Sequence, residues 1–191
     1  MNTRIPRIEF EALPPSIAAA LAAKVERLGY LGEFFARTAH QEAALAAFID
    51  FTEASKEALD MRLVELLALT VACLKDVPYE RNQHERLAVK LGFGEDWVRA
   101  VERLDPEHAE LTETERAVQR YAIEAVRHHG HGAGIYLDAL VERIGHRDAV
   151  AVMMVLARYV AHALMVNSMN IPAPVPSIFD DRPASPGSPS A

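Results

Sequence analysis

One short stretch decides how this chain is interpreted: Pro78-Tyr79-Glu80-Arg81-Asn82-Gln83-His84. Glu80 and His84 are four residues apart, so on a helix they lie on one face, about one turn apart. The same face continues into the apolar residues Leu87, Ala88 and Leu91. The acid and the histidine are therefore expected to point inward. Such groups cost free energy in an interior unless they pair or take part in chemistry.

Composition places the chain among single-domain globular proteins. It has 191 residues, of which 50% are hydrophobic and 7% aromatic, and a formal net charge of −7. No basic run is present, so we expect no nucleic-acid partner. The single cysteine, Cys73, excludes an intrachain disulfide framework and suits a reducing compartment. Without a signal-peptide pattern or a long uncharged apolar run, the prediction is a cytoplasmic protein that does not span a membrane.

Helix signals dominate the sequence, and the predicted fold class is all-α. Asp60 can cap a helix, Pro78 suits a first turn, and Thr112 with Glu115 is typical of a capping box. Apolar residues recur at helical spacing, and no segment shows the alternation of a strand. The expected helices cover about 15–28, one or more within 32–59, then 60–74, 78–91, 95–104, 112–130, 132–145 and 148–169.

Three regions are predicted along the chain. Residues 1–30 form an N-terminal extension with a helix, and residues 31–171 form the main helical domain. Residues 172–191 are rich in Pro and Ser, and we expect a flexible tail because they cannot bury enough apolar surface to fold alone. Ile178 and Phe179 are the exception, as candidates to dock on a neighbour.

The pattern of residues resembles the carboxymuconolactone decarboxylase and alkylhydroperoxidase D-like (AhpD-like) family. The similarity runs from His40 through the apolar helix with Glu65 to the 79–84 segment, and on through Gly92 and the 95–98 turn. It returns over residues 148–172. The resemblance implies an AhpD-like helical bundle. It also implies a homo-oligomer (a dimer, trimer or hexamer), because family members are commonly trimers or hexamers.

Redox members of this family carry a glutamate, then Cys-x-Tyr-Cys twelve residues later, and a histidine four residues after the second cysteine. Glu65, Tyr79 and His84 match the glutamate, the tyrosine and the histidine. Val77 and Glu80 stand where the cysteines would be. Peroxide reduction by a dithiol needs an attacking thiolate and a resolving thiol. The resemblance therefore does not carry peroxidase activity to this chain.

A second branch of the family lacks the cysteine pair and often has Tyr-Glu-Trp-x-x-His at this position. This chain follows that branch, with Arg81 in place of the tryptophan. The branch includes the decarboxylase that gives the family its name. The resemblance thus implies a small-molecule substrate and no redox cysteines.

Glu65, Glu80 and His84 are the predicted catalytic residues. Two carboxylates close together in a dry pocket would raise the pKa of one of them, and a histidine beside it could then exchange a proton with the acid. In a decarboxylation without a cofactor, an enzyme must stabilise an enolate and deliver a proton to carbon. A histidine with a glutamate behind it fits both needs, and isomerisation or lactone opening would use the same groups.

Four further residues are predicted to bind substrate: Tyr79, Arg81, Arg158 and His162. Arg81 could hold a carboxylate or point to water. Arg158 could hold a substrate carboxylate or a buried acid, and His162 could complete the pocket or lie at an edge.

No metal and no cofactor are predicted. The histidine cluster at 128–131 has the spacing of no standard metal site, and its position suits a helix C-terminus. Three functions stay open: an acid–base lyase or isomerase acting on a small carboxylic acid or lactone, an oxidoreductase of the hydroperoxidase type, and a non-catalytic oligomeric protein that binds a small ligand.

Overall fold

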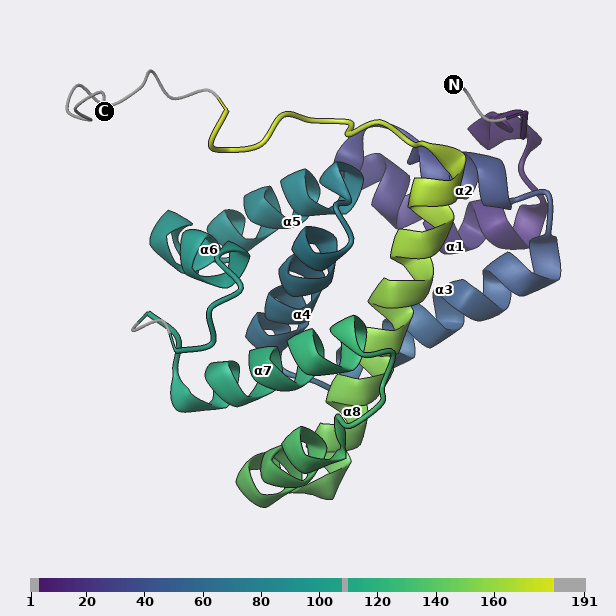
Figure 1. Cartoon of the computed structure of the whole chain (residues 1–191). Coiled ribbons are helices and arrows are strands. Elements are labelled where there is room, and N and C mark those ends of the chain that lie inside the picture. Colours follow the sequence, from purple (N-terminus) through teal and green to yellow (C-terminus); the bar gives the residue numbers. More distant parts are fainter. Residues whose placement is uncertain (1–3, 108–109, 181–191) are drawn as a thin grey trace, which may run out of the picture.

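The computed structural model describes residues 4–107 and 110–180, and within these ranges every regular element is a helix (Figure 1). The predicted all-α class is therefore confirmed. A short 3₁₀ turn, η1, precedes eight α-helices. Their bounds are η1 Phe10–Ala12, α1 Pro15–Leu28, α2 Glu33–Thr38, α3 Glu42–Glu57, α4 Met61–Leu74, α5 Pro78–Lys90, α6 Glu95–Glu102, α7 Glu113–Arg127 and α8 Gly134–Met169.

Helix α4 is the centre of the fold. Every residue from Val64 to Ala72 is buried, and α4 contacts α5, α6, α7 and α8. Its sequence predicts this position, because a helix that is apolar on all sides can be stable only inside a protein. Glu65 is the one charged residue in that buried run, and its side chain must therefore find a partner.

The predicted start signals are present at the helix ends. The side chain of Asp60 accepts a hydrogen bond from the backbone N–H of Arg62, and Thr112 with Glu115 forms a complete capping box. Pro78 lies in the first turn of α5. These contacts satisfy backbone donors that have no partner within the helix.

Two regions of the chain each hold two helical stretches, in agreement with the sequence. The region 32–59 holds two helices, α2 and α3, separated by a turn at residues 39–41. The helices expected over 132–145 and 148–169 are both present in α8, as two helical stretches that meet at a kink at Gly145, where φ is 80° and ψ is 161°. Glycine adopts this positive φ without strain, so the helical conformation is interrupted at a single residue and the chain changes direction there.

Helix α8 has the length and apolar composition that a membrane span would need. However, 56% of its most apolar window is buried inside this protein, and the helix packs against α3, α4 and α7. This pattern is typical of a core helix.

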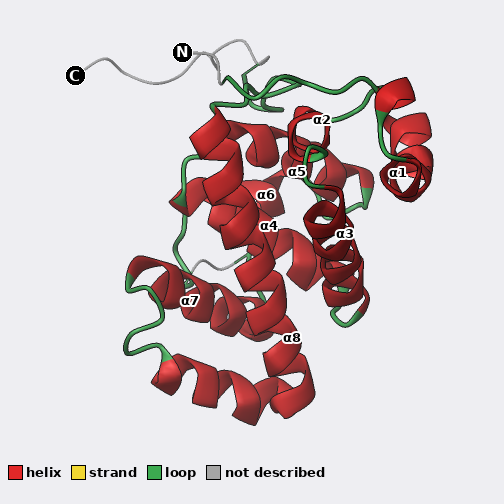
Figure 2. Ribbon diagram, turned by 90° about the vertical axis from the view of Figure 1, so that its right-hand side faces the viewer, coloured by secondary structure: helices red, strands yellow, loops and turns green. Residues whose placement is uncertain are grey.

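The N-terminal segment belongs to the same helical body. Helix α1 packs on α3, and α3 packs on α8, so α1 and α3 cover one side of the bundle (Figure 2). Ile17 and Leu21 fix α1 in place with exposed fractions of 0% and 1%. The helix predicted within residues 1–30 is thus present as α1, and it contributes Ile17 and Leu21 to the core.

Residues 172–180, expected to begin a flexible tail, lie on α5. The side-chain amide of Asn82 donates to the carbonyl of Val175 at 2.8 Å, and Glu85 accepts from the Ser177 hydroxyl at 2.7 Å and from the Ile178 N–H at 2.8 Å. Phe179 packs under the guanidinium of Arg99 in the same chain. Composition cannot show such contacts, because buried polar groups of α5 make them. Residues 181–191 lie outside the described residues.

Glu115 joins three elements through its buried carboxylate. It accepts from Arg62 Nε of α4 at 2.6 Å, from Trp97 Nε1 of α6 at 2.7 Å, and from the backbone N–H of Thr112 at 2.7 Å. Glu115 is only 2% exposed. Its partners would lose their acceptor if the carboxylate were removed.

We predict that Glu115→Ala lowers the free energy of unfolding by about 2–4 kcal/mol, because it leaves a buried indole N–H and a guanidinium unpaired. Urea denaturation measures this loss. Glu113→Ala is the matched control in the same helical turn. Its carboxylate is exposed and pairs with Arg143 at the surface, so the expected cost is under about 1 kcal/mol. Equal losses in the two variants would contradict this role of Glu115.

Candidate active site

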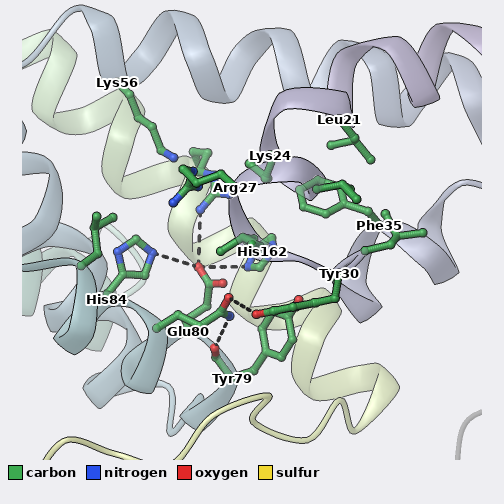
Figure 3. Close-up of a pocket in the computed structure, with 17 residues that line it drawn as sticks. Leu21, Lys24, Arg27, Tyr30, Phe35, Lys56, Tyr79, Glu80, His84 and His162 are labelled. Carbon is green, nitrogen blue, oxygen red and sulfur yellow. Dashed lines mark hydrogen bonds and ion pairs between the residues drawn. The ribbon is translucent and has the colours of Figure 1, made fainter. Parts of the chain in front are cut away.

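A pocket of about 150 Å³ lies between α1, α3, α5 and α8 (Figure 3). Its polar wall holds Lys24, Arg27, Tyr30, Lys56, Tyr79, Glu80, Gln83, His84, Arg158 and His162. A larger hollow of about 640 Å³ lies beside Phe34 and Phe48, but it is mostly apolar, and no carboxylate of the described residues lines it. The smaller pocket therefore has the groups that can perform chemistry.

His84 is held from behind by Glu65. Its Nδ1 lies 2.7 Å from Oε2 of Glu65, which is 1% exposed in the middle of α4. The tight turn between α4 and α5 brings these residues together, although they are 19 positions apart. This contact fixes the orientation of the imidazole ring and leaves Nε2 on the side of Glu80.

Glu80 is the point on which the charged groups converge. Its Oε2 lies 3.3 Å from Nδ1 of His162, 3.6 Å from Nε2 of His84 and 3.6 Å from Nη1 of Arg158 (Figure 3). Arg158 is oriented by a 3.1 Å hydrogen bond from its Nε to the hydroxyl of Thr52. The distances around Glu80 exceed those of good hydrogen bonds, so these groups surround the oxygen without saturating it.

The charges set the protonation states. Burial opposes ionisation of Glu80, but His162, His84 and Arg158 outweigh it and lower its pKa well below the usual range. Burial also disfavours charged His84, but Glu65 and Glu80 raise its pKa to about 9. Burial lowers the pKa of His162 to about 4, with Glu80 opposing, so His162 is neutral. The sequence predicted a raised carboxyl pKa; instead the proton belongs to His84, because two cations, His84 and Arg158, lie beside Glu80.

Tyr79 lies in the pocket wall next to Gly32. A Cβ at position 32 would lie 2.9 Å from the Tyr79 hydroxyl, so only glycine lets this segment approach so closely. Gln83 donates to the Tyr79 carbonyl at 2.6 Å and lies 3.4 Å from the Tyr30 hydroxyl. Burial raises the pKa of Tyr79, which keeps its hydroxyl protonated.

Arg81 does not belong to this site, in contrast to the prediction from sequence. Its side chain lies outside the pocket, with Nε 3.4 Å from Oε1 of the buried Glu85. Because consecutive residues point about 100° apart around a helix, Arg81 faces away from Glu80. Arg158, His162 and Tyr79 do line the pocket, as expected for substrate-binding residues.

Sequence reasoning missed the cations that α1 and α3 bring to the pocket, chiefly Lys24 and Lys56. In each helix the sequence does indicate that the lysine faces inward, because the lysine lies on the buried stripe. Lys24 continues the buried stripe of Ile17 and Leu21, and Lys56 continues a stripe that includes Ile49. A lysine at an apolar position of an amphipathic helix points inward, toward either a core or a pocket.

The remaining candidates lie elsewhere. His128, His129 and His131 are exposed at the end of α7, and His128 lies 3.5 Å from Glu124. Within residues 4–107 and 110–180, no group of three or more His, Cys, Asp or Glu side chains could hold a metal ion. Cys73 is half-buried, and burial raises the pKa of its thiol to about 12, which opposes thiolate chemistry.

We predict that His84 keeps its proton at neutral pH and loses it only as the pH rises through about 9. Glu65→Gln removes the nearest negative charge, so the pKa of His84 falls in that variant. An NMR pH titration of the imidazole measures both values, with the signal assigned by its loss in His84→Gln. The control is Glu57→Gln at an exposed position. A normal His84 pKa that ignores the Glu65 change would contradict the geometry.

No protein-family model and no curated protein matches the sequence. Solved structures do share the fold. An uncharacterized peroxidase-related protein from Ralstonia eutropha JMP134 with an alkylhydroperoxidase AhpD core superposes with a TM-score of 0.76 at 19% identity, over 89% of this chain and 91% of that one. The debrominase Bmp8 in complex with 2,3,4-tribromopyrrole superposes with a TM-score of 0.77 at 15% identity. The match covers 89% of this chain and 91% of that one.

A third structure is a protein of unknown function from Agrobacterium tumefaciens, named as an antioxidant defence protein AhpD. It gives a TM-score of 0.66 at 16% identity, over 72% of this chain and 94% of that one. Identities this low show similarity of fold alone. The AhpD-like helical bundle expected from the sequence is thus confirmed, and this chain has the fold of the alkylhydroperoxidase D core.

Proposed function

We propose that this chain is an acid–base enzyme, a lyase or isomerase that acts without a cofactor on a small carboxylic acid or lactone. The observation that supports this proposal is the row Glu65–His84–Glu80, in which a protonated imidazole lies between two buried carboxylates at the wall of a pocket. A charged acid held in place within a small pocket is the main requirement for general acid catalysis.

In this proposal His84 is the proton donor. When a 3-oxo acid loses CO₂, the bond between the carboxyl carbon and its neighbour breaks, and the electron pair forms an enolate. The Nε2 proton of His84 then passes to that carbon, and Glu65 stabilises the ring before and after the transfer. In lactone hydrolysis, water would add to the carbonyl carbon and lose a proton to solvent, the ring C–O bond would break, and the same proton of His84 would pass to the leaving oxygen.

Glu80 is a weak base in this site, because its pKa is lowered. We assign Glu80 an electrostatic role: together with Glu65, its negative charge keeps His84 protonated. Arg158 balances its charge at 3.6 Å, and neutral His162 can donate or accept a hydrogen bond toward a bound molecule. The long contacts around Oε2 of Glu80 leave room for a substrate group to complete the network.

A thiol route has less support. The chain has one cysteine, so no dithiol can form within it, and Cys73 does not line the pocket. The peroxidase-related and debrominase neighbours show that the fold accommodates more than one named activity, and fold alone does not select among them. A non-catalytic protein that binds a small ligand is the other alternative.

We predict that His84→Gln lowers turnover of an accepted 3-oxo acid or carboxylated lactone by about 10²–10⁴-fold, because the proton donor is lost. Turnover of the wild type should fall as the pH rises through about 9, where His84 loses its proton. Release of CO₂, or ring opening followed by NMR, measures the rate over a substrate panel.

His128→Gln is the control, since His128 is an exposed histidine far from the pocket wall. Unchanged turnover in His84→Gln would overturn the acid role. Turnover of an organic hydroperoxide that disappears in Cys73→Ser would favour the thiol route instead.

We also propose that the chain assembles with copies of itself. Supporting this, α8 exposes an apolar stripe at helical spacing: Val150, Met153, Met154 and Leu164, which are 38–58% exposed. Large exposed apolar side chains in a row favour association.

Light scattering should therefore give a mass that is a multiple of 21.1 kDa. The double variant Met154→Glu, Leu164→Glu should lower that mass, because charges would have to be buried at the contact. A monomeric wild-type protein would contradict the proposal. Lys90→Glu, away from the stripe, is the control.

A further inference from the structure

We infer that the side of the pocket formed by α1 and α3 is an anion subsite, in which Lys24, Lys56 and Arg158 bind a carboxylate of the substrate. The inference deepens the proposed function, since it assigns the substrate a carboxylate remote from the reacting carbon. It rests on that function for the identity of the reaction, but the subsite can be tested without turnover.

Three separate helices supply the cations. Lys24 comes from α1, Lys56 from α3 and Arg158 from α8, and all of them line the pocket that contains Glu80 and His84. In Figure 3 the two lysines lie on the opposite side of Glu80 from Tyr79. A molecule in the pocket would therefore meet His84 on one wall and the lysines on another.

The positive charge of this wall is incompletely balanced. In the part of the chain that the structure describes, neither lysine forms an ion pair, and the contact of Lys24 is with the ring of Phe35 at 4.8 Å. Arg158 is 6% exposed, and its Nη1 has no hydrogen-bond partner among the described residues; Glu80 lies 3.6 Å from it. A buried guanidinium nitrogen without a hydrogen bond is unusual, because leaving it so costs free energy.

The titration of the lysines agrees with this geometry. Burial and the charge of Arg158 lower the pKa of Lys56 to about 8, although Glu53 opposes them. Burial also lowers the pKa of Lys24, again with Glu53 opposing and Arg158 assisting. Both ammonium groups are therefore held in an environment that disfavours their charge. An anion placed among them would relieve that penalty, and this is a source of binding free energy.

The carboxylate and the reacting group must belong to one small molecule. The pocket holds only about 150 Å³, and Glu80 already neutralises part of the charge near His84. The remaining cations lie toward α1 and α3. A carboxylate bound there would direct the rest of the molecule toward His84. The subsite thus selects bifunctional acids, such as a dicarboxylic acid or a lactone that keeps a free carboxylate.

Succinate is the probe, and isothermal titration calorimetry on the full chain measures its binding. We expect succinate to bind and its uncharged diamide, succinamide, not to bind. Lys56→Met and Lys24→Met keep the apolar stem and remove the charge, so each should weaken succinate binding by about tenfold. Lys56→Arg keeps the charge and should bind within about threefold of wild type. Lys90→Met, at the end of α5, should match the wild type.

Each contrary outcome overturns the subsite. Equal binding of succinate and succinamide would show that charge is not recognised. Wild-type affinity in a folded Lys56→Met and Lys24→Met double variant would place the anion elsewhere, and tighter binding of inorganic phosphate than of succinate would reject a carboxylate site. Loss of binding in His84→Gln alone would place the anion on the imidazole.

Failure of the subsite and failure of the proposed function are distinguishable. Succinate binding that depends on the lysines, with no turnover of any substrate, would keep the subsite and reject the enzyme. Turnover that depends on His84, together with succinate binding that does not depend on the lysines, would keep the proposed enzyme and reject the subsite.

Discussion

The buried contact between Glu65 and His84 is the constraint on which the site depends. Glu65 lies in the most buried stretch of α4, where its neighbours are apolar and water does not reach it. A carboxylate in that position is stable only if a cation or hydrogen-bond donor meets it there. His84 of α5 is that partner at 2.7 Å, so the pair fixes the facing surfaces of α4 and α5.

The contact between Glu65 and His84 is the first in a series of neighbouring groups whose charges alternate in sign. His84 lies between two carboxylates, and Glu80 in turn lies among His84, His162 and Arg158. Alternation of sign explains why the histidine, and not an acid, keeps the proton. The same alternation leaves Lys24 and Lys56 outside the network, as cations that form no ion pair with any residue in 4–107 or 110–180.

Most of the helices could be predicted, because capping residues and apolar periodicity are local signals. The face of α5 that lines the pocket was predictable too, since Glu80 and His84 share a face with apolar residues. The residues on the opposite wall of the pocket could not be predicted. Lys24 and Lys56 are far away in sequence, and their helices reach the pocket only through packing of α1 on α3 and α3 on α8. Arg81 shows the opposite error: adjacent in sequence to Glu80, it points toward Glu85.

Val77 and Glu80, the positions that correspond to the cysteine pair in the resemblance found from the sequence, have different surroundings in the structure. Val77 caps the start of α5 and is 1% exposed, so it contributes packing alone. Glu80 lies one turn further, in the pocket, with its Oε2 3.6 Å from Nε2 of His84. A carboxylate there cannot transfer electrons, but it raises the proton affinity of the imidazole. A glutamate at this position therefore provides no thiol chemistry, and the negative charge that it places beside His84 and Arg158 supports the proposed proton transfer.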